Sequence, residues 1–196
     1  DPAVLIVPKD SKFKNVADLV AFAKENPGKV TINGAGLYVG HHIATLQLQK
    51  ATGVKMSYIP EKGGTEAIQN VLGGKVMAGF NNLADVYRSQ DRLTILAIAD
   101  VKRHEYLPDV PTLQELGYNV DDASVNFRGY ALPKGVAPSI VDKAAKIVPV
   151  MFHDPEVVKR MKDSGSPMLI MDRAQVLEMF QKKQETLKAL LSDLRK

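Results

Sequence analysis

Three times between residues 1 and 74, a short apolar run is followed by a segment whose apolar residues have helical spacing. The three runs are Ala3–Val7, Val30–Asn33 and Lys55–Ile59. Short apolar runs that end at proline or glycine are typical of buried strands. Strands that alternate with helices in this way predict an α/β fold with a mixed, largely parallel sheet.

The same reading extends to the rest of the chain. Further strands are expected at Val76–Phe80, Leu93–Ala99, Val125–Leu132 and Met168–Met171. Helix starts are expected at Asn15 with Asp18, at Thr112 with Glu115 (a short helix ending at Gly117), at Asp154-Pro155, and at Asp172 with Gln175. We expect a kink or break at Pro149 in the helix over Ser139–Phe152. The last helix has an apolar stripe formed by Val176, Phe180, Leu187, Leu191 and Leu194.

Glycine turns join the strand to the helix in the second and third of these units, at Gly34-Ala35-Gly36 and at Gly63-Gly64-Thr65. The first-turn N–H groups and the dipole of a helix can hold an anion without a charged side chain. An ordinary short connection uses the same glycines, because glycine permits tight turns. The pattern alone leaves both interpretations open.

An ordered series of short segments becomes recognisable at Arg103. The segments include Arg103, Leu107-Pro108-Asp109-Val110-Pro111-Thr112-Leu113, Glu115 with Gly117, Asn26-Pro27-Gly28-Lys29, Pro60 with Lys62-Gly63-Gly64, Leu72-Gly73-Gly74 and Pro133-Lys134-Gly135. The series covers essentially the whole chain, and its order rather than any single segment makes it specific. It resembles the solute receptors of the tripartite tricarboxylate transporters, also called the Bug or TctC family.

The resemblance implies a two-lobed fold like that of the type II periplasmic binding proteins. Residues 8–122 would form one complete α/β lobe, the second lobe of the family. Residues 1–7 and 123–196 would form hinge crossings and the C-terminal part of an incomplete first lobe. The resemblance also implies a periplasmic location and delivery of the ligand to a membrane permease.

Family members usually carry further residues ahead of the position that Asp1 occupies here. We therefore expect a fragment or a truncated version that lacks the N-terminal part of the first lobe, and the start at Asp1-Pro2 without a methionine or signal peptide agrees with this. The strand at Val125–Leu132 and the helices after Pro138 would then expose apolar faces. This predicts self-association or a covering partner chain.

The candidate ligand-binding residues are Gly36, Tyr38, Gly40, Gly63, Gly64, Thr65, Asn81 and Phe127. Tyr38 either stacks on an aromatic acid or donates its phenol to a carboxylate, or else is an ordinary surface tyrosine. Asn81 can bond carboxylate and ammonium groups, and an asparagine pair at a strand end is equally a turn. Phe127 lies near the predicted hinge. The family often has tyrosine where this chain has Glu61, whose carboxylate we expect to face solvent or to pair with Lys62.

The adjacent histidines His41 and His42 suggest a metal or catalytic site, but neighbouring helical residues point about 100° apart and cannot chelate one metal as an i, i+4 pair does. We expect His42 to donate a structural hydrogen bond near a helix start. No nucleophile elbow, phosphate-loop lysine motif or triad pattern is found in the sequence. We expect no catalytic residue, no metal and no cofactor.

The composition excludes several other classes. The formal net charge of +4 is mild, and a nucleic-acid binder usually shows a denser basic stripe with interleaved aromatic residues. With 0 cysteines the chain has no disulfide, thiolate metal site or cysteine nucleophile. No apolar run approaches the roughly 18 residues of a membrane span.

The leading hypothesis is therefore a non-catalytic receptor that captures a small organic carboxylate, such as a di- or tricarboxylate, an acidic amino acid or an aromatic acid, at helix N-termini. The alternatives are a truncated interaction module that no longer takes part in transport, and an enzyme on a similar sheet. Binding of an organic acid would separate the receptor from both.

Overall fold

The computed structural model describes residues 1–192 and divides the chain into two compact units, Asp1–Asn126 and Phe127–Lys196. Leu194, a member of the predicted stripe on the last helix, lies outside the described residues. Each unit is described by itself below.

A five-stranded sheet forms the centre of the first unit. Its strands are β1 (Ala3–Pro8), β2 (Thr31–Ala35), β3 (Ser57–Glu61), β4 (Ala78–Asn82) and β5 (Leu93–Ala99), in the order β3-β2-β4-β1-β5. β2 pairs in parallel with β3 and β4, whereas β1 runs antiparallel to β4 and β5. The predicted α/β class with a mixed sheet is confirmed, and β1 is the one strand that runs against the other four.

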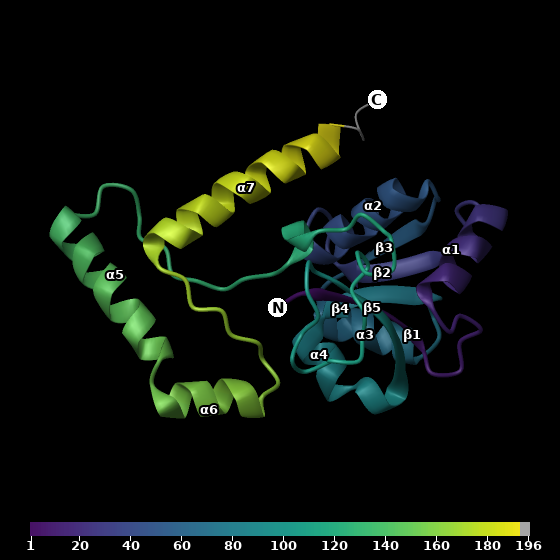
Figure 1. The fold of residues 1–196 in the computed structure, drawn as a ribbon, viewed down its shortest axis with the longest axis horizontal. Coiled ribbons are helices and arrows are strands. Elements are labelled where there is room, and N and C mark those ends of the chain that lie inside the picture. Colours follow the sequence, from purple (N-terminus) through teal and green to yellow (C-terminus); the bar gives the residue numbers. More distant parts are fainter. Residues whose placement is uncertain (193–196) are drawn as a thin grey trace. The chain divides into compact units, whose positions relative to one another are not determined.

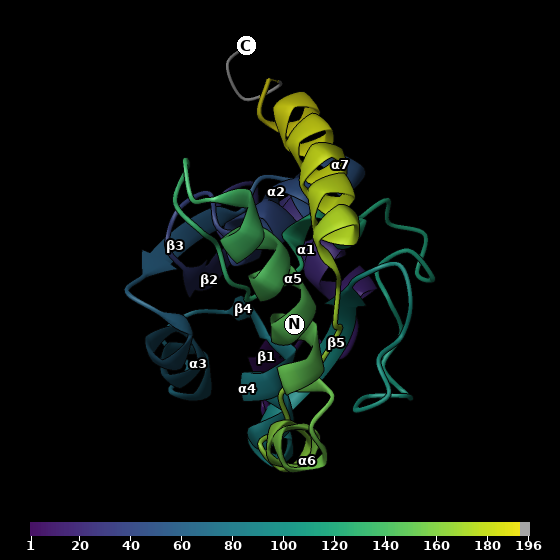
Figure 2. The same ribbon diagram turned by 90° about the vertical axis from the view of Figure 1, so that its left-hand side faces the viewer.

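Helices cover both faces of this sheet. They are α1 (Val16–Glu25), α2 (Gly40–Thr52), α3 (Gly64–Leu72) and α4 (Leu83–Arg88), with 3-10 turns η1 (Gln90–Arg92) and η2 (Asp122–Ser124). The alternation of β1 shows how the two faces are filled. Leu5 and Val7 pack in the core cluster that contains the apolar residues of α1 and α2, whereas Val4 and Ile6 pack in the cluster that contains those of α3 and α4. Figures 1 and 2 show these helix pairs on opposite sides of the strands.

The first unit is larger than the lobe expected for residues 8–122. β1 lies between β4 and β5, and the unit continues to Asn126. The side chains of β1 are buried on both faces, and its backbone pairs with β4 on one side and β5 on the other, so β1 is an interior strand of this sheet. The sequence boundaries therefore differ from the compact units, and the assignment of residues 1–7 and 123–196 to hinge crossings and a first lobe stays a prediction.

The short helix predicted at Thr112 does not form. Its capping box is present, because Thr112 N donates to Glu115 Oε2 at 2.8 Å and Glu115 N donates to Thr112 Oγ1 at 3.1 Å. However, Thr112 also forms a bridge with Ile98 at the edge of β5, and Gly117 turns the chain with a φ of 86°. Only a turn fits between these two constraints.

The second unit contains α5 (Pro138–Phe152), α6 (Pro155–Asp163) and α7 (Arg173–Ser192). Two of their predicted starts are confirmed: Asp154 accepts from Glu156 N at 2.8 Å, and Asp172 and Gln175 form a reciprocal capping box with two distances of 2.9 Å. α5 continues through Pro149 to Phe152, so the helix does not break there.

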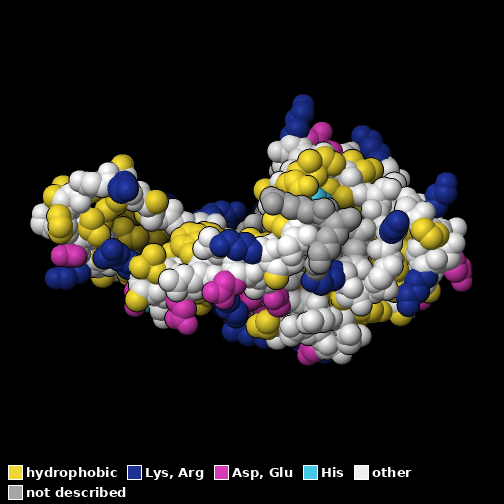
Figure 3. Space-filling model, turned by 90° about the horizontal axis from the view of Figure 1, so that it is seen from above, with side chains coloured by type: hydrophobic (Ala, Val, Ile, Leu, Met, Phe, Trp, Pro, Cys, Tyr) yellow, Lys and Arg dark blue, Asp and Glu magenta, His cyan; other side chains and the backbone are white. Residues whose placement is uncertain are grey.

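The strands predicted at Val125–Leu132 and Met168–Met171 are wrong, because both segments are irregular. A strand needs a partner for its backbone groups, and within residues 127–192 no strand is available to pair with them. Apolar side chains therefore remain on the surface of this unit, among them Tyr130, Leu132, Ile140, Val150 and Leu169. Figure 3 shows such side chains in yellow at the left of the view.

Candidate functional site

Three parallel strands of the first unit end side by side. Ala35 of β2 is in register with Glu61 of β3, and Asn33 of β2 is in register with Gly79 of β4. Their connections lead directly into α2, α3 and α4, so three helices begin along one edge of the sheet. We call this region, from the ends of β2, β3 and β4 to the first turns of these helices, the strand-end edge. Gly36 N donates to Glu61 O at 2.9 Å, which brings the two predicted glycine turns together.

The start of α3 is open to its surroundings. Gly63 occupies the N-cap in an extended conformation and has no side chain to accept a bond from the first turn. A Cβ placed on Gly63 would meet nothing within 4 Å, and Thr65 is exposed. The N–H groups of Gly64 and Thr65 have no i−4 carbonyl inside the helix. The predicted turn therefore presents first-turn N–H groups to the solvent side of the edge.

The start of α2 is different in character. Val39 is its N-cap and also lacks a capping side chain. Gly36 and Tyr38 have φ values of 57° and 58°, and the side chains from Leu37 to Val39 are exposed. Gly40, by contrast, is packed tightly: a Cβ there would collide with the Ser124 carbonyl oxygen.

His41 links the two neighbouring strand ends. Its Nδ1 accepts from Ala35 N at 2.9 Å, which places the ring proton on Nε2, and Nε2 lies 3.0 Å from Asn82 Oδ1. Burial lowers the pKa of His41, while the bond to Asn82 and the charge of Asp85 oppose that effect. A buried imidazole that accepts at one nitrogen and donates at the other is held neutral.

His42 supports the other side of the edge. Its Nδ1 accepts from Tyr38 N at 3.0 Å, so the prediction that His42 donates this structural bond is wrong in direction. Its ring stacks on the Tyr58 ring, with 4.3 Å between the ring centroids, and lies against the Tyr38 ring with 5.1 Å between the centroids. Burial lowers the pKa of His42 as well. The adjacent histidines thus support different groups. His41 orients the amide of Asn82, whereas the ring of His42 packs on Tyr38 and Tyr58.

Asn81 is buried and both ends of its amide are used inside the protein. Its Nδ2 donates to Gly64 O at 2.8 Å, and its Oδ1 accepts from Asn82 N at 2.8 Å. These bonds tie the end of β4 to the start of α3. Asn81 therefore holds the α3 turn in place, and a direct contact with a ligand would require one of these bonds to break.

Asn82 is the residue at this strand end that sequence reasoning undervalued. Its Oδ1 accepts from both His41 Nε2 and Asn126 Nδ2, the second at 2.6 Å. Two donors on Oδ1 fix the orientation of the amide. Within residues 1–192, the Nδ2 group of Asn82 has no acceptor at hydrogen-bonding distance, so it is a positioned donor. The Asn-Asn pair was the available signal, but only the strand register distinguishes its two members.

Glu61 is half-buried and makes no ion pair with Lys62 among the described residues, so the pairing alternative of that prediction is wrong. Its Oε1 accepts from Asn70 Nδ2 at 2.8 Å and from Asn33 Nδ2 at 3.2 Å. The reason is that β3 ends beside β2, which brings the Asn33 amide within reach. Burial, with a contribution from Glu61, raises the pKa of Tyr58.

Phe127 belongs to the second unit, where its half-exposed ring packs edge-to-face on Phe180 with centroids 5.3 Å apart. Gly36, Tyr38, Gly40, Gly63, Gly64, Thr65 and Asn81 all lie along the strand-end edge of the first unit. The structure thus brings together every candidate except Phe127 within one unit.

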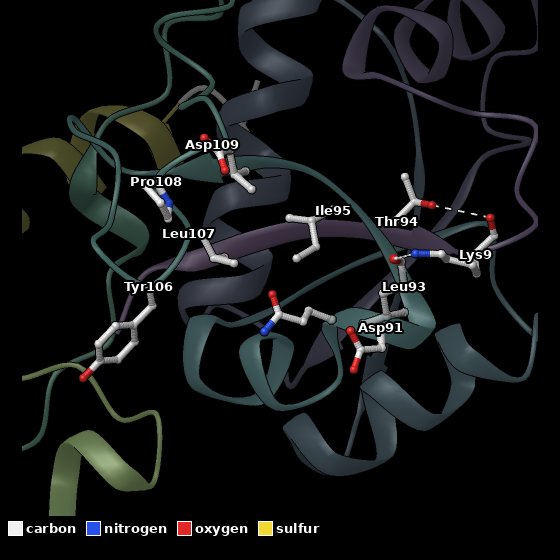
Figure 4. Close-up of a pocket in the computed structure, with 11 residues that line it drawn as sticks. Lys9, Asp91, Leu93, Thr94, Ile95, Tyr106, Leu107, Pro108 and Asp109 are labelled. Atoms are coloured by element: carbon white, nitrogen blue, oxygen red, sulfur yellow. Dashed lines mark hydrogen bonds between the residues drawn. The ribbon is translucent and has the colours of Figure 1, made fainter.

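A pocket of about 430 Å³ lies at the opposite end of the sheet, where β1 ends and β5 begins. Figure 4 shows Lys9 and Thr94 on one side of it, with Leu107, Pro108 and Asp109 on the other. Lys9 Nζ donates to Leu93 O at 3.5 Å. The segment that begins at Leu107 therefore closes this end of the sheet and takes no part in the strand-end edge.

No group of three or more His, Cys, Asp or Glu side chains that could hold a metal ion is found among residues 1–192. Over the same residues, no helix is both long enough and apolar enough to cross a membrane.

Comparison with known proteins identifies relatives over nearly the whole chain. The family model described as "Tripartite tricarboxylate transporter family receptor" matches residues 1–195. The UPF0065 protein of the gbd 5′ region of Cupriavidus necator is 39% identical over 140 residues, which are 71% of this chain and 42% of that protein. Protein BugT of Bordetella pertussis is 32% identical over 171 residues, which are 86% of this chain and 52% of BugT.

Solved structures share the fold. An R. palustris protein solved with adipate has a TM-score of 0.81 at 20% identity, covering 97% of this chain and 64% of that one. MatC from Rhodopseudomonas palustris with bound malate has a TM-score of 0.77 at 21% identity, covering 96% of this chain and 65% of MatC. The chain spans about half the length of the curated relatives named above.

Proposed function

Because this chain belongs to the tripartite tricarboxylate transporter family of receptors, we propose that it captures a small organic carboxylate at the strand-end edge. Two proteins of the same fold were solved with the carboxylates adipate and malate, which supports this class of ligand. The family and the structural neighbours are solute-binding receptors, and this favours binding over catalysis.

The observation that carries the proposal is the uncapped start of α3. In three helices of residues 1–192, the side chain of the residue before the first turn accepts from a first-turn N–H group; these residues are Asn15, Asp154 and Asp172. At the strand-end edge, the chain instead places Gly63 at the N-cap, with open space where a capping side chain would stand. A carboxylate of the ligand supplies the missing acceptor there, and the helix dipole favours its charge.

Asn82 is the second element of the proposed carboxylate site. Its Nδ2 group is oriented by the bonds that Oδ1 accepts from His41 and Asn126, and Asn82 is the last residue of β4 at the same edge of the sheet. A donor that is fixed before binding loses little conformational entropy when the ligand arrives. The neutral state of His41 means that these contacts rest on dipoles and N–H groups, without a histidine cation.

The remaining parts of the receptor function are proposed on the family membership alone. The chain would act outside the cytoplasm and hand its ligand to the membrane permease subunits of a transporter. We propose that the complete lobe predicted for residues 8–122 carries the ligand contacts, because these residues include the strand-end edge.

The test is a titration of the 196-residue chain with adipate and with malate by isothermal calorimetry, using two variants of one position. In Gly63→Asp, a carboxylate caps α3 and repels an anion, so we expect at least tenfold weaker binding, about 1.4 kcal/mol or more. Gly63→Ala adds a Cβ in the same open space, without an acceptor and without a charge. This variant should therefore bind within about threefold of the original chain, a difference of about 0.7 kcal/mol or less.

Equal affinities for Gly63→Asp and Gly63→Ala would contradict the placement of the carboxylate at α3. A complete absence of binding for both acids and for a wider set of organic acids at millimolar concentration would contradict the receptor function of this chain.

A further inference from the structure

On the basis of the carboxylate-binding function proposed above, we propose further that the ligand has an apolar body, an aromatic ring or an aliphatic chain, which packs on the connection between β2 and α2. This connection carries Leu37, Tyr38 and Val39, which we call the apolar rim. The chemical class of this ligand is a carboxylate whose carbon skeleton lacks hydroxyl and amino groups.

Exposure of the apolar rim is the first observation. Leu37, Tyr38 and Val39 are 55%, 62% and 45% exposed, although they are consecutive in sequence. A single exposed apolar residue is ordinary, whereas a contiguous exposed group beside a binding site is typical of a surface that contacts a ligand. Ile59 and Pro60 at the end of β3 are exposed as well, but the rim is the longer contiguous exposed apolar group at this edge.

The rim is also held rigidly. Tyr38 has a φ of 58°, a conformation that favours glycine, and a tyrosine there is under strain. Its backbone N–H donates to His42 Nδ1 at 3.0 Å, and its ring rests on the His42 ring. His42 in turn stacks on Tyr58, whose hydroxyl donates to Gly36 O at 3.0 Å. The stacked rings of His42 and Tyr58 thus hold Tyr38 in a strained conformation. The rim is therefore preorganised to present an aromatic face.

The position of the rim relative to the carboxylate site is the second observation. The two connections start at registered residues, Ala35 and Glu61, and Gly36 N donates to Glu61 O. A ligand whose carboxylate contacts the first turn of α3 therefore extends its remaining atoms toward the rim. The connection after β3 is polar, with Lys62, Gly63 and Thr65, whereas the connection after β2 is apolar.

Charge excludes a different occupant of the rim. Residues 34–42 contain no lysine or arginine, and both histidines of this stretch are held as neutral acceptors. A second carboxylate or a hydroxylated segment over the rim would lose water without gaining a charged partner. A ring or a methylene chain gains from the same burial.

The test is a calorimetric titration of the 196-residue chain with acids of equal charge. Succinate, adipate and terephthalate increase in apolar carbon, whereas malate adds a hydroxyl group to succinate. We expect adipate to bind about fourfold or more tighter than succinate, since each fully buried methylene contributes about fourfold and the rim covers the chain only partly. Malate should bind more weakly than succinate.

Two variants assign the preference to the rim. Tyr38→Gly removes the ring and relieves the backbone strain, so this variant is expected to fold, and the ratio of terephthalate to succinate affinity should fall at least fivefold. Tyr38→Phe keeps the ring and should keep the ratio, which separates packing from a hydrogen bond by the phenol.

Malate binding as tightly as adipate would overturn the inference, and so would a Tyr38→Gly variant that weakens every acid equally. If all acids bind without preference and Gly63→Asp abolishes their binding, only the apolar rim is wrong as a ligand contact. If no acid binds, the carboxylate-binding function and this inference fail together.

Discussion

The helices of this chain begin in two ways, which differ in where their first-turn N–H groups find acceptors. At α1, Asn15 Oδ1 accepts from Asp18 N at 2.8 Å, and comparable side-chain caps begin α6 and α7. At α2 and α3, the N-caps are Val39 and Gly63, which have no side-chain acceptor. Both of these starts lie at the strand-end edge. The N-cap residues of α4 and α5, Asn82 and Ala137, also make no capping bond, but in α4 Asp1 Oδ1 accepts from Ala84 N at 3.2 Å, and α5 begins in the second unit. Among the α-helices of residues 1–126, α2 and α3 are thus the two whose first turns receive no side-chain acceptor, and both begin at one place, as a receptor for anions requires.

The largest expected effect is a difference in stability between alanine variants at the starts of α2 and α3. Gly40→Ala at α2 should lower the free energy of unfolding by about 2–3 kcal/mol, because the new Cβ collides with the Ser124 carbonyl and lies 2.7 Å from Asn126 Oδ1. Gly63→Ala should change it by no more than about 0.5 kcal/mol, since nothing lies within 4 Å of that Cβ. Urea denaturation of both variants measures the difference. Similar losses at the two positions would show that α3 is not open at its start.

Sequence reasoning succeeded where a signal is local. The caps at Asn15, Asp154 and Asp172 depend on residues two or three positions away, and the structure has all three. The strand over Leu93–Ala99 was predicted with its observed ends because its buried run is long and almost purely apolar. The two glycine turns were placed correctly for the same reason.

The failures involve partners that are distant in sequence. A strand at Val125–Leu132 fits the local pattern, but residues 127–192 contain no strand that could pair with it. The roles of His41 and Asn82 depend on the parallel pairing of β2 with β4, which brings residues 41 positions apart within 3.0 Å. The bond from Asn33 to Glu61 arises in the same way. No local pattern contains the strand pairing that sets these contacts. The sequence therefore points to Asn81 as the ligand-binding residue, whereas in the structure Asn82 has the available donor.

A smaller effect is expected when a capped start is opened. Asn15→Ala removes the acceptor for Asp18 N and should cost about 1 kcal/mol of stability, while Asn15→Asp retains the cap. Neither change should alter the affinity for adipate, because α1 begins away from the strand-end edge. Thermal or urea denaturation combined with calorimetry measures both quantities. An Asn15→Ala variant that keeps full stability but binds adipate more weakly would contradict the division between capped and open starts.

The smallest effect is a dependence of stability on pH. Burial lowers the pKa of His41, His42 and His104 in the folded chain below their ordinary value near 6.5. As the pH falls through 6.5, the unfolded chain takes up protons that the folded rings do not, so the free energy of unfolding decreases. Between pH 7.5 and 6.5 the loss is at most about 0.35 kcal/mol for each ring, the limit reached when the folded ring stays neutral while the unfolded histidine becomes half protonated.

His41→Gln tests which part of the molecule carries this dependence, because glutamine can accept and donate without titrating. Its stability should fall less steeply below pH 7 than that of the original chain. Hydrogen exchange locates the effect: the Ala35 N–H, which donates to His41 Nδ1, should lose protection on acidification. The Asp18 N–H at the capped start of α1 should keep its protection relative to global unfolding, because the amide of Asn15 does not titrate. Equal loss at both sites would mean that acid acts on the whole unit, and that the open edge has no separate dependence on a neutral His41.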